Sequence, residues 1–288
     1  MQESGMDTGN DIFNTSPDPF AGLISRPDGS LALLLRSEGG FPRRPGAAMA
    51  LWPDGVRIGR LGAGCIDADI AGHLGAAEPV TRLIYGKGGP IDLPLPCGGS
   101  VEIALIQRPD PEWLRQIAHA RKIRQAAYWR IGLAEGEVRM TETAETGLHG
   151  DEFVLKLYPG CALHIHGEGD EATALAAMAR AIGLDCHVGA NSVTADAQTA
   201  VVALFHDHDR ELTILRDALA SDAFYIGAMG SHRAQVARLA GLRDVGVGEE
   251  ELAKLRGPIG VVAPAREPRL LAASVLTEIL SLYDRAFG

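Results

Sequence analysis

The stretch CALHIHGEGDEATALAAMARAIGLDCHV, residues 161–188, decides the fold of the C-terminal half. The apolar run Cys161–His166 predicts a strand, and the alanine-rich segment Asp170–Ile182 predicts a helix that ends at Gly183. Leu184–Val188 predicts a second strand. A strand, a helix and a strand within so short a stretch indicate a βαβ unit, whose two strands are parallel.

The same alternation continues to the C-terminus. Strands are predicted at Thr199–Phe205, Ala223–Ile226 and Gly260–Val262, and helices at Arg210–Ala220, Ser231–Leu239 and Pro268–Tyr283. Strands and helices that alternate in this way imply a parallel sheet with helices on both faces. Residues 151–288 are therefore predicted to form a Rossmann-like domain.

The N-terminal half has a different pattern, in which short apolar runs are separated by glycine-rich and proline-rich turns. Strands are predicted at Leu31–Arg36, Ala48–Trp52, Val56–Leu61 and Val101–Ile106, and helices at Ile66–Leu74 and Pro111–Ala120. Residues 19–150 thus predict a mostly-β, α+β domain, with final strands and a linker after residue 120. Residues 1–18, rich in Asp, Asn, Ser and Pro, are expected to form a disordered tail.

Charge and composition exclude several classes of protein. The chain of 288 residues has 37 acidic against 27 basic side chains, a net charge of -10, which disfavours nucleic acid as a partner. No run reaches the ~18 apolar residues of a membrane span, and the N-terminus lacks the pattern of a signal peptide. We expect a cytoplasmic protein, whose reducing compartment keeps its four cysteines as thiols. None of them forms a C-x-x-C pair, so neither a zinc knuckle nor a thioredoxin-like motif is indicated.

The sequence GEGDEA, residues 167–172, fits the dinucleotide fingerprint G-x-G-x-x-A between a strand and a helix. Gly167 would allow the tight turn, and Gly169 would let the backbone approach a pyrophosphate. However, the turn contains three carboxylates, and residues 189–191 lack the acid that would bind a ribose. Two interpretations stay open: a site for NAD or FAD, or a structural turn with Asp170 as helix N-cap.

A second glycine-containing turn, GAMGSHR at residues 227–233, also follows a predicted strand and begins a helix. Gly227, Gly230, the N-cap Ser231 and the guanidinium of Arg233 together suit an anion site. The alternative is a simple helix cap with a solvent-facing arginine.

Two His-x-His segments, at residues 164–166 and 206–208, lie near the ends of strands that would be neighbours at the switch point of the sheet. His206 is therefore a candidate ligand contact. Metal binding and ordinary structural hydrogen bonding are both open for these histidines.

Three further candidate segments lie in the N-terminal half. Cys65 lies in LGAGCID, and Cys97 and Gly98 lie in LPCGGS, so each thiol is on a glycine-rich turn whose N–H groups can stabilise a thiolate. A soft thiolate suits molybdenum, copper or a sulfur-transfer intermediate, although free cysteines are most often buried as small apolar residues. Arg43 and Arg44, in FPRRPG, could clamp a phosphate or a pterin.

Together, and in this order, the motifs resemble the XdhC/CoxI family, the accessory proteins of molybdenum hydroxylases. The resemblance covers most of the chain and rests on residues 31–46, 62–67, 95–102, 205–208, 225–233, 257–260 and 274–279. The chain differs from the family at residues 167–172, where the family turn reads Gly-Ala-Gly-His-Val-Gly, at Ala190 and at residues 261–264.

The resemblance implies a maturation factor that binds the molybdenum cofactor, as molybdopterin or its dinucleotide form. The factor would insert the cofactor into an apo-hydroxylase of the xanthine dehydrogenase, aldehyde oxidase or CO dehydrogenase type. The family's cysteines correspond to Cys65 and Cys97, which become candidate contacts of molybdenum or sulfur, and its Gly-Ser-x-Arg loop corresponds to Gly230, Ser231 and Arg233. A sulfur-donor protein and a second copy of the chain are further candidate partners. The alternatives are an NAD(P)- or FAD-dependent oxidoreductase and a scaffold that binds no cofactor.

Overall fold

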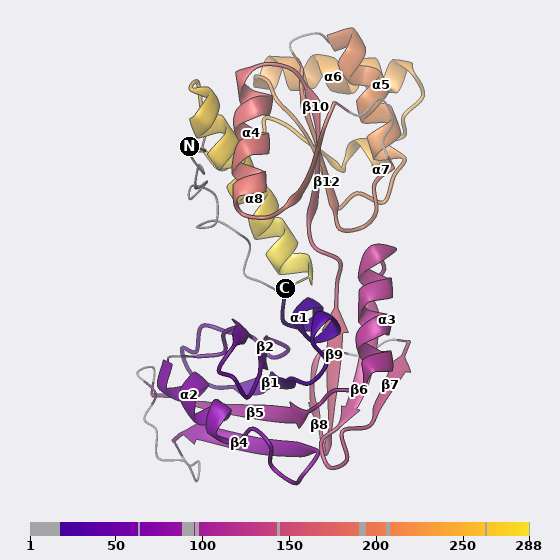
Figure 1. Cartoon of the computed structure of the whole chain (residues 1–288). Helices are drawn as coiled ribbons and strands as arrows, with labels where there is room; N and C mark the ends of the chain where they lie inside the picture. The colour runs from indigo at the N-terminus through magenta and orange to yellow at the C-terminus, as the bar shows by residue number, and fades with distance from the viewer. Residues whose placement is uncertain are drawn as a thin grey trace, which may run out of the picture. The chain divides into compact units, whose positions relative to one another are not determined.

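The chain consists of two compact units in the computed structural model, which describes residues 18–62, 64–87, 95, 98–142, 145–189, 194–205, 208–262 and 264–287. One unit ends at Pro159 and the other begins at Gly160 (Figure 1). The first unit holds antiparallel sheets and the second a parallel sheet, which confirms the predicted fold class. Among the described residues, no helix is long and apolar enough to cross a membrane.

Two sheets form the first unit. One has the antiparallel order β3-β2-β1-β5-β4, and the other has the order β7-β6-β9-β8. The strands are β1 (Ser30–Ser37), β2 (Ala48–Leu51), β3 (Arg57–Gly59), β4 (Val80–Gly86), β5 (Ser100–Gln107), β6 (Ala127–Gly132), β7 (Val138–Thr141), β8 (Gly147–His149) and β9 (Glu152–Leu157). The helices are α1 (Pro19–Ser25), α2 (Gly64–Gly72) and α3 (Pro111–Lys122).

The boundary between the units differs from the expected one at residue 150. Strand β9 pairs antiparallel with β6, from Ala127 opposite Leu157 to Gly132 opposite Glu152, and so belongs to the first unit. The segment after residue 120 contains the expected final strands, β6, β7 and β8, and these belong to one sheet with β9 rather than to a linker. At the other end, the carboxylate of Asp18 accepts the Phe20 N–H at 3.1 Å and caps α1, so the ordered unit includes a residue expected in the tail.

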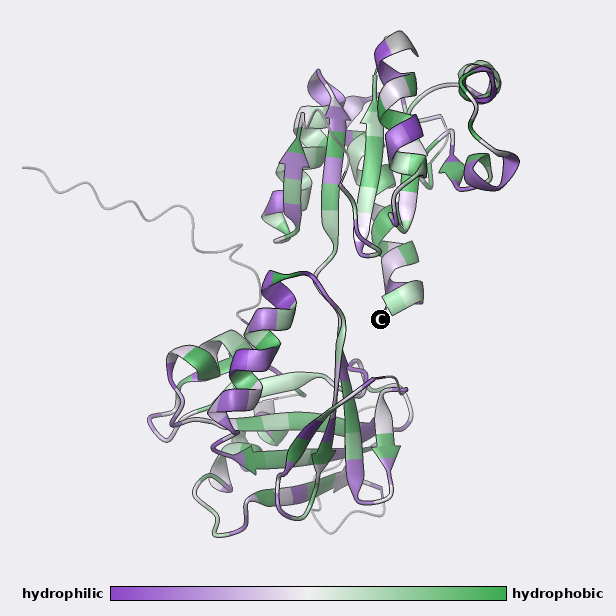
Figure 2. Cartoon of the chain, turned by 90° about the vertical axis from the view of Figure 1, so that its right-hand side faces the viewer, coloured by the Kyte–Doolittle hydropathy of each residue, from purple (hydrophilic) through white to green (hydrophobic). Residues whose placement is uncertain are grey.

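Both faces of the five-stranded antiparallel sheet are buried, because each face packs against its own apolar cluster. Leu31, Leu33 and Leu35 of β1 belong to a cluster with three tryptophans, Trp52, Trp113 and Trp129. The alternate residues Ala32 and Leu34 belong to a second cluster that includes Ile66 of α2. The central strands are consequently apolar along most of their length (Figure 2).

The second unit has a parallel sheet in the order β11-β10-β12-β13-β14. Its strands are β10 (Ala162–Gly167), β11 (Asp185–Val188), β12 (Thr199–Leu204), β13 (Tyr225–Ala228) and β14 (Leu255–Arg256). Its helices are α4 (Asp170–Ala181), α5 (His208–Leu219), α6 (His232–Asp244), α7 (Glu249–Leu252) and α8 (Pro268–Phe287). Gly183, with φ +79°, follows the end of α4 in the left-handed conformation, as expected from its position.

Alternate residues of β12 divide the core of this unit between the two faces of the sheet. Ala200 and Val202 pack with residues of α4 and α8, whereas Val201 and Ala203 pack with residues of α5 and α6. Figure 1 shows α4 and α8 on one side of the sheet and α5 and α6 on the other. This is the doubly covered parallel sheet that the alternating pattern predicted.

The prediction of a strand at Gly260–Val262 is wrong. These residues form a loop, and the last strand among the described residues is β14, Leu255–Arg256. Gly260 has φ +99°, outside the range of a strand. Its N–H donates to Glu278 Oε2 at 2.6 Å, and the Val262 N–H donates to Ser274 Oγ at 2.7 Å. Side chains of α8 therefore accept hydrogen bonds from these N–H groups, in place of the carbonyl groups of a neighbouring strand.

Candidate functional site

The carboxyl edge of the parallel sheet is the natural ligand site of this fold. Strand β10 pairs with β11 on one side and with β12 on the other, so the connections from β10 and β12 leave in opposite directions. Ligands of open parallel sheets bind at such a switch point, outside the carboxyl ends of the strands. Two cavities open at this edge, and each of them includes residues that follow a strand.

The larger cavity, with a volume of about 540 Å³, lies where α6 and α8 begin. Its size falls within the roughly 300–1,000 Å³ that is usual for small-molecule sites. Apolar walls come from Met229, Pro258, Ile259, Val262 and Leu271. The polar groups of its lining come from Glu171, Ser231, His232, Arg266 and Glu267.

The starts of α6 and α8 border this cavity. Ser231 caps α6 by accepting the Ala234 N–H at 3.2 Å, and Glu267 accepts the Leu270 N–H at 2.7 Å in the first turn of α8. Helix N-termini carry the positive end of the helix dipole and N–H groups without partners in the helix. With the guanidinium of Arg266 beside them, they favour a ligand that carries an anionic group.

The second glycine turn contributes to this cavity only in part. Gly230, at φ +144°, and Ser231 line it, as the anion-site interpretation requires. Gly227 is instead buried within β13, where an added Cβ would lie 2.7 Å from a methyl group of Ile259. Arg233 is exposed on α6 and does not belong to the lining, so the arginine of the cavity is Arg266.

A buried ion pair, which the sequence did not reveal, stabilises the turn at residues 227–233. Arg238 of α6 donates to Glu211 Oε1 of α5 at 2.8 Å, and the side chains of both are only 1% exposed. The same guanidinium donates to the Met229 carbonyl at 2.6 Å and to Gln235 Oε1 at 2.5 Å. Arg238 therefore ties α5, α6 and the wall of the cavity together.

The loop at residues 259–262, which contributes to the lining of the larger cavity, is held by side chains of α8. Glu278 Oε2 accepts the Gly260 N–H and, at 3.0 Å, the hydroxyl of Tyr225 on β13. Burial, and then the nearby carboxylate of Glu278, raise the pKa of Tyr225, so the phenol stays protonated and donates. One turn earlier on α8, Ser274 binds the Val262 N–H, so α8 fixes the position of Ile259 and Val262.

The first glycine turn is required by the close approach of two strands. Gly167 has φ +141°, and a Cβ on it would lie 2.2 Å from the Leu204 carbonyl oxygen of β12. Gly169, at φ +103°, is the N-cap of α4, which places Asp170 at the first helical position rather than at the cap. These roles agree with the structural interpretation of the turn, and binding of NAD or FAD there stays a prediction.

The smaller cavity, of about 360 Å³, adjoins this turn and is lined by residues including His166, Glu168, Gly189, Phe205 and Arg210. Arg210 Nη2 lies 3.2 Å from Glu168 Oε1, and its guanidinium carbon lies 5.6 Å from the centre of the Phe205 ring. His206 falls outside the described residues. Within the part of the chain that the structure describes, no three His, Cys, Asp or Glu residues are grouped to hold a metal ion.

The candidate motifs of the first unit leave the same end of its five-stranded sheet. The FPRRPG segment with Arg43 and Arg44 joins β1 to β2, Cys65 follows β3, and Gly98 precedes β5. Glu38 and Ser100 pair across two of these loops, through the Glu38 N–H to the Ser100 carbonyl at 2.8 Å. Phe41, Ile66 and Leu95, one from each loop region, belong to a single apolar cluster.

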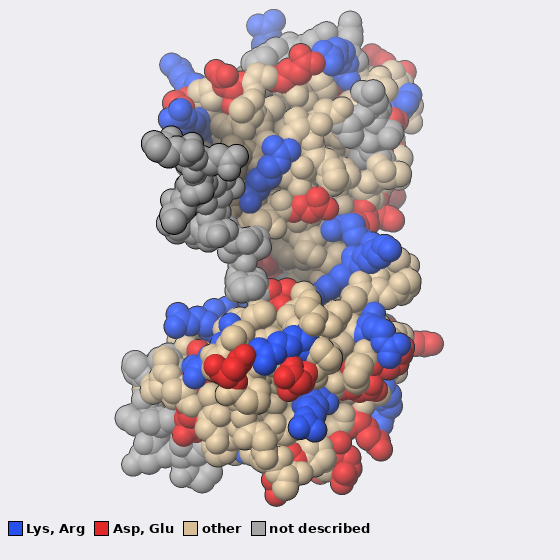
Figure 3. Space-filling model, in the orientation of Figure 1, with Lys and Arg blue, Asp and Glu red and all other residues tan. Residues whose placement is uncertain are grey.

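Cys65 lies in the first turn of α2 and its side chain is exposed. The buried carboxylate of Asp67 accepts the N–H groups of Leu61 and Gly62 at 3.3 and 3.0 Å, which fixes the loop in front of the thiol. Cys97 lies outside the described residues. Gly98, beside it, is exposed with φ +67°, and Arg43 and Arg44 are exposed on their loop. On the face in view, acidic and basic side chains are interspersed over each unit (Figure 3).

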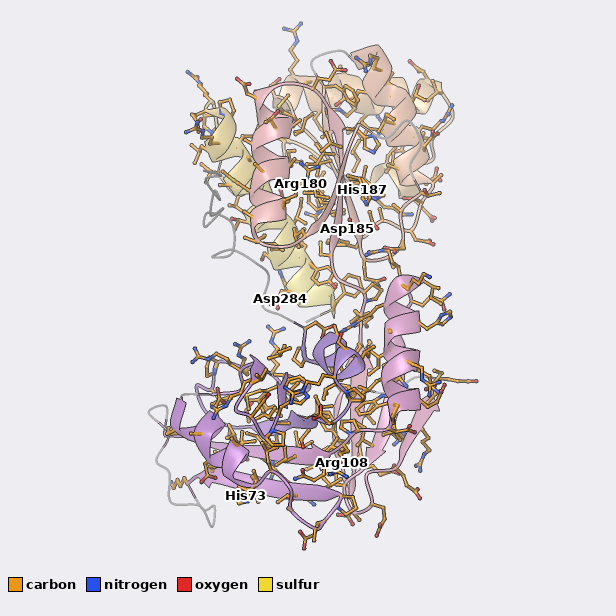
Figure 4. The ribbon with its side chains drawn as sticks, viewed as in Figure 1. His73, Arg108, Arg180, Asp185, His187 and Asp284 are labelled. Atoms are coloured by element: carbon orange, nitrogen blue, oxygen red, sulfur yellow. The ribbon has the colours of Figure 1, made fainter. Side chains whose placement is uncertain are left out.

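The exposure of the thiols predicts an order of chemical labelling. Cys186 is half-buried on β11, and burial raises the pKa of its thiol. Its neighbours in sequence, Asp185 and His187, are labelled in Figure 4. Because the thiolate is the reactive form, we expect iodoacetamide at pH 7.5 to label Cys65 at least about tenfold faster than Cys186. Peptide mass spectrometry over a time course measures both rates. Equal rates would mean that Cys65 is not freely accessible.

Fold and site together define a class: a two-unit α/β protein whose Rossmann unit presents an anion-favouring cavity at the carboxyl edge of its sheet. The chain matches the family "XdhC Rossmann domain" over residues 163–279 and the family "XdhC and CoxI family" over residues 26–79. It is 32% identical over 271 residues to the molybdenum cofactor insertion chaperone PaoD of Escherichia coli (strain K12), covering 90% of this chain and 85% of PaoD. The chain belongs to the XdhC and CoxI family.

Two more distant relatives share the fold or part of their sequence. YqeB of Escherichia coli (strain K12), an uncharacterized protein, is 24% identical over 265 residues, which cover 90% of this chain and 44% of YqeB. A crystal structure described as a xanthine dehydrogenase from Bacillus halodurans superposes with a TM-score of 0.74 at 16% identity, over 96% of this chain and 97% of the other. That likeness shows the fold alone.

Proposed function

We propose that this protein is an accessory factor that binds the molybdenum cofactor and assists its insertion into an apo-molybdenum hydroxylase. The observation that carries the proposal is the 32% identity to a molybdenum cofactor insertion chaperone, which extends over 90% of the chain. The geometry of the second unit supports it. A cavity between the starts of two helices, with Arg266 in its lining, suits a cargo that carries a phosphate.

Each unit, taken by itself, offers groups that suit part of such a cargo. In the second unit, Gly230, Ser231 and the start of α6 would bind the phosphate or nucleotide end. In the first unit, the thiols of Cys65 and Cys97 would contact molybdenum or its sulfur ligand, because thiolates are soft ligands. Arg43 and Arg44, on the neighbouring loop, would bind further negative charge. A hydroxylase of the xanthine dehydrogenase, aldehyde oxidase or CO dehydrogenase type is the expected client.

The first test measures which ligand the purified protein retains. The protein is incubated separately with molybdopterin, the molybdenum cofactor, NAD and FAD, and each mixture is passed through gel filtration. Retention of a pterin form alone supports the proposal. Retention of only NAD or FAD would favour the alternative, an oxidoreductase or flavin-binding Rossmann protein. Retention of none, with client binding intact, would favour a scaffold.

The role of the thiols is tested by substitution. Cys65→Ser and Cys97→Ser are expected to reduce the amount of active client that the protein matures, and the double variant is expected to abolish most of it. Cys186→Ser, in the other unit, is the matched control and should mature the client normally. Normal maturation by the double variant would remove the thiols from the proposal, while cofactor retention would still report on the cavity.

A cytoplasmic location, a sulfur-donor partner and a homodimer remain predictions from the sequence. Size-exclusion chromatography with light scattering measures the oligomeric state directly. Co-purification with a protein that carries transferable sulfur would identify a sulfur donor.

A further inference from the structure

The larger cavity contains a carboxylate where a site for a simple anion would have none. Glu171, in the first turn of α4, is half-buried and lines the cavity together with Ser231 and Arg266. Glu267, the other acid of the lining, accepts the Leu270 N–H of α8 and thereby serves its own helix. A phosphate alone would be repelled by Glu171. A ligand that carries N–H donors as well as an anionic group would match the whole lining better than a simple anion.

The remaining lining is suited to a flat ring. Pro258, Ile259 and Val262 form an apolar wall. Glu278 and Ser274 of α8 accept the N–H groups of Gly260 and Val262 in this segment. A wall held in this way keeps its shape before the ligand arrives, which lowers the cost of ordering it on binding. The cavity thus combines an apolar surface for a ring, a carboxylate for its edge, and two helix starts for a phosphate.

We propose that Glu171 selects a fused ring with a 2-amino-4-oxo edge, as found in pterins and in guanine. This inference rests on the proposed function and specifies which part of the cargo the cavity recognises. The ring N–H and the exocyclic amino group of such an edge are parallel donors that match the two oxygens of a carboxylate. Paired hydrogen bonds to a charged group are both strong and directional. A carboxylate has about four lone-pair positions, so it can accept from the ligand in addition to partners within the protein.

The same carboxylate disfavours other common rings. Adenine presents a ring nitrogen acceptor beside its amino group, and a flavin presents two carbonyls around its single N–H. Each would place an acceptor against the oxygens of Glu171, and the lone pairs of the two groups would repel each other. The cavity is therefore expected to bind a ring with a 2-amino-4-oxo edge and to discriminate against the adenine ring of NAD and the flavin ring of FAD.

Isothermal titration of the full chain with GMP, IMP and AMP tests the inference, because these probes share the phosphate and differ at the ring edge. We expect GMP to bind at least about tenfold more tightly than AMP, with IMP between them, since it lacks only the amino group. Glu171→Gln should remove most of this preference. Glu168→Gln is the matched control, because Glu168 lies in the same turn, is 81% exposed at its side chain and does not line this cavity.

Fluorescence quenching of free pterin distinguishes the two sources of the edge. Tighter binding of pterin than of GMP, sensitive to Glu171→Gln, supports the inference with a pterin as ligand, and the reverse order supports it with a guanine nucleotide. Equal affinities for GMP and AMP, or an unchanged preference in Glu171→Gln, would overturn it. If no probe binds to protein that retains the molybdenum cofactor, the inference fails and the proposed function stands. If GMP binding depends on Glu171 but no cofactor is retained, the proposed function fails instead.

Discussion

Replacement of Arg238 by methionine is expected to destabilise the second unit by about 3–5 kcal/mol, because it leaves the carboxylate of Glu211 buried without its partner. The side chains of both residues are only 1% exposed, and they join α5 to α6 at 2.8 Å. The substitution also removes the donor to the Met229 carbonyl, in the wall of the cavity. Hydrogen exchange followed by mass spectrometry measures the loss in peptides of α5, α6 and β13, while peptides of the first unit serve as internal reference.

Two further variants separate the buried pair from a general effect of removing charge. Arg243→Met removes an arginine from the same helix, where it pairs with Glu249 at 2.5 Å on the surface, and should change exchange little. The double variant Arg238→Met with Glu211→Met should be more stable than Arg238→Met alone, because no uncompensated charge remains. Unchanged exchange in Arg238→Met would show that the pair does not hold these helices together.

This ion pair also shows why the sequence predicted the fold better than the site. The Rossmann unit follows from local patterns: apolar runs such as Thr199–Leu204 alternate with helical segments, and Ser231 is recognisable as an N-cap because capping needs only neighbouring residues. Glu211 and Arg238, by contrast, look like ordinary charges on surface helices. Only the packing of α5 against α6 buries them together.

The residues that line the larger cavity could not be predicted either, because packing brings them together from separate segments of the chain. Motif spacing favoured Arg233 as the cation, but the cavity is lined by Arg266 from the loop before α8. The apolar residues of Gly260–Val262 predicted a strand. Glu278 and Ser274 of α8 instead accept hydrogen bonds from this segment and hold it as a loop. Strand β4, Val80–Gly86, was not among the predicted strands, although its β-branched and aromatic residues favour one. It pairs along its length with β5.

The motifs of the first unit were identified one by one, and the antiparallel register explains why they belong together. Ser37 pairs with Val101, Gly86 with Ser100, and Met49 with Gly59, so the loops that follow or precede these residues emerge at one end of the sheet. Spacing along the chain does not contain this information, because the register depends on contacts between distant strands. The loops are packed closely, and this closeness can be tested at Gly99.

Gly99→Ala is expected to destabilise the first unit by about 3 kcal/mol or more, because there is no space for the added methyl group. Its Cβ would lie 1.9 Å from the Glu38 carbonyl oxygen, on the loop that leads to Arg43 and Arg44. This atom belongs to the backbone, so relief requires that the loop move and that the Glu38–Ser100 pairing weaken. Urea unfolding followed by tryptophan fluorescence measures the loss, since Trp52, Trp113 and Trp129 all lie in this unit.

Gly98 provides the matched control, because it is the adjacent glycine with a different constraint. It has φ +67°, but an added Cβ would have no neighbour within 4 Å. Gly98→Asn should therefore cost no more than about 1 kcal/mol, since asparagine tolerates the left-handed conformation. If the loops also position Cys65 and Cys97 for the cargo, Gly99→Ala should mature less client than Gly98→Asn at equal amounts of folded protein. Equal free energies of unfolding for the two variants would show that the close approach of Gly99 to Glu38 does not contribute to stability, and that the loop at Glu38 moves without cost.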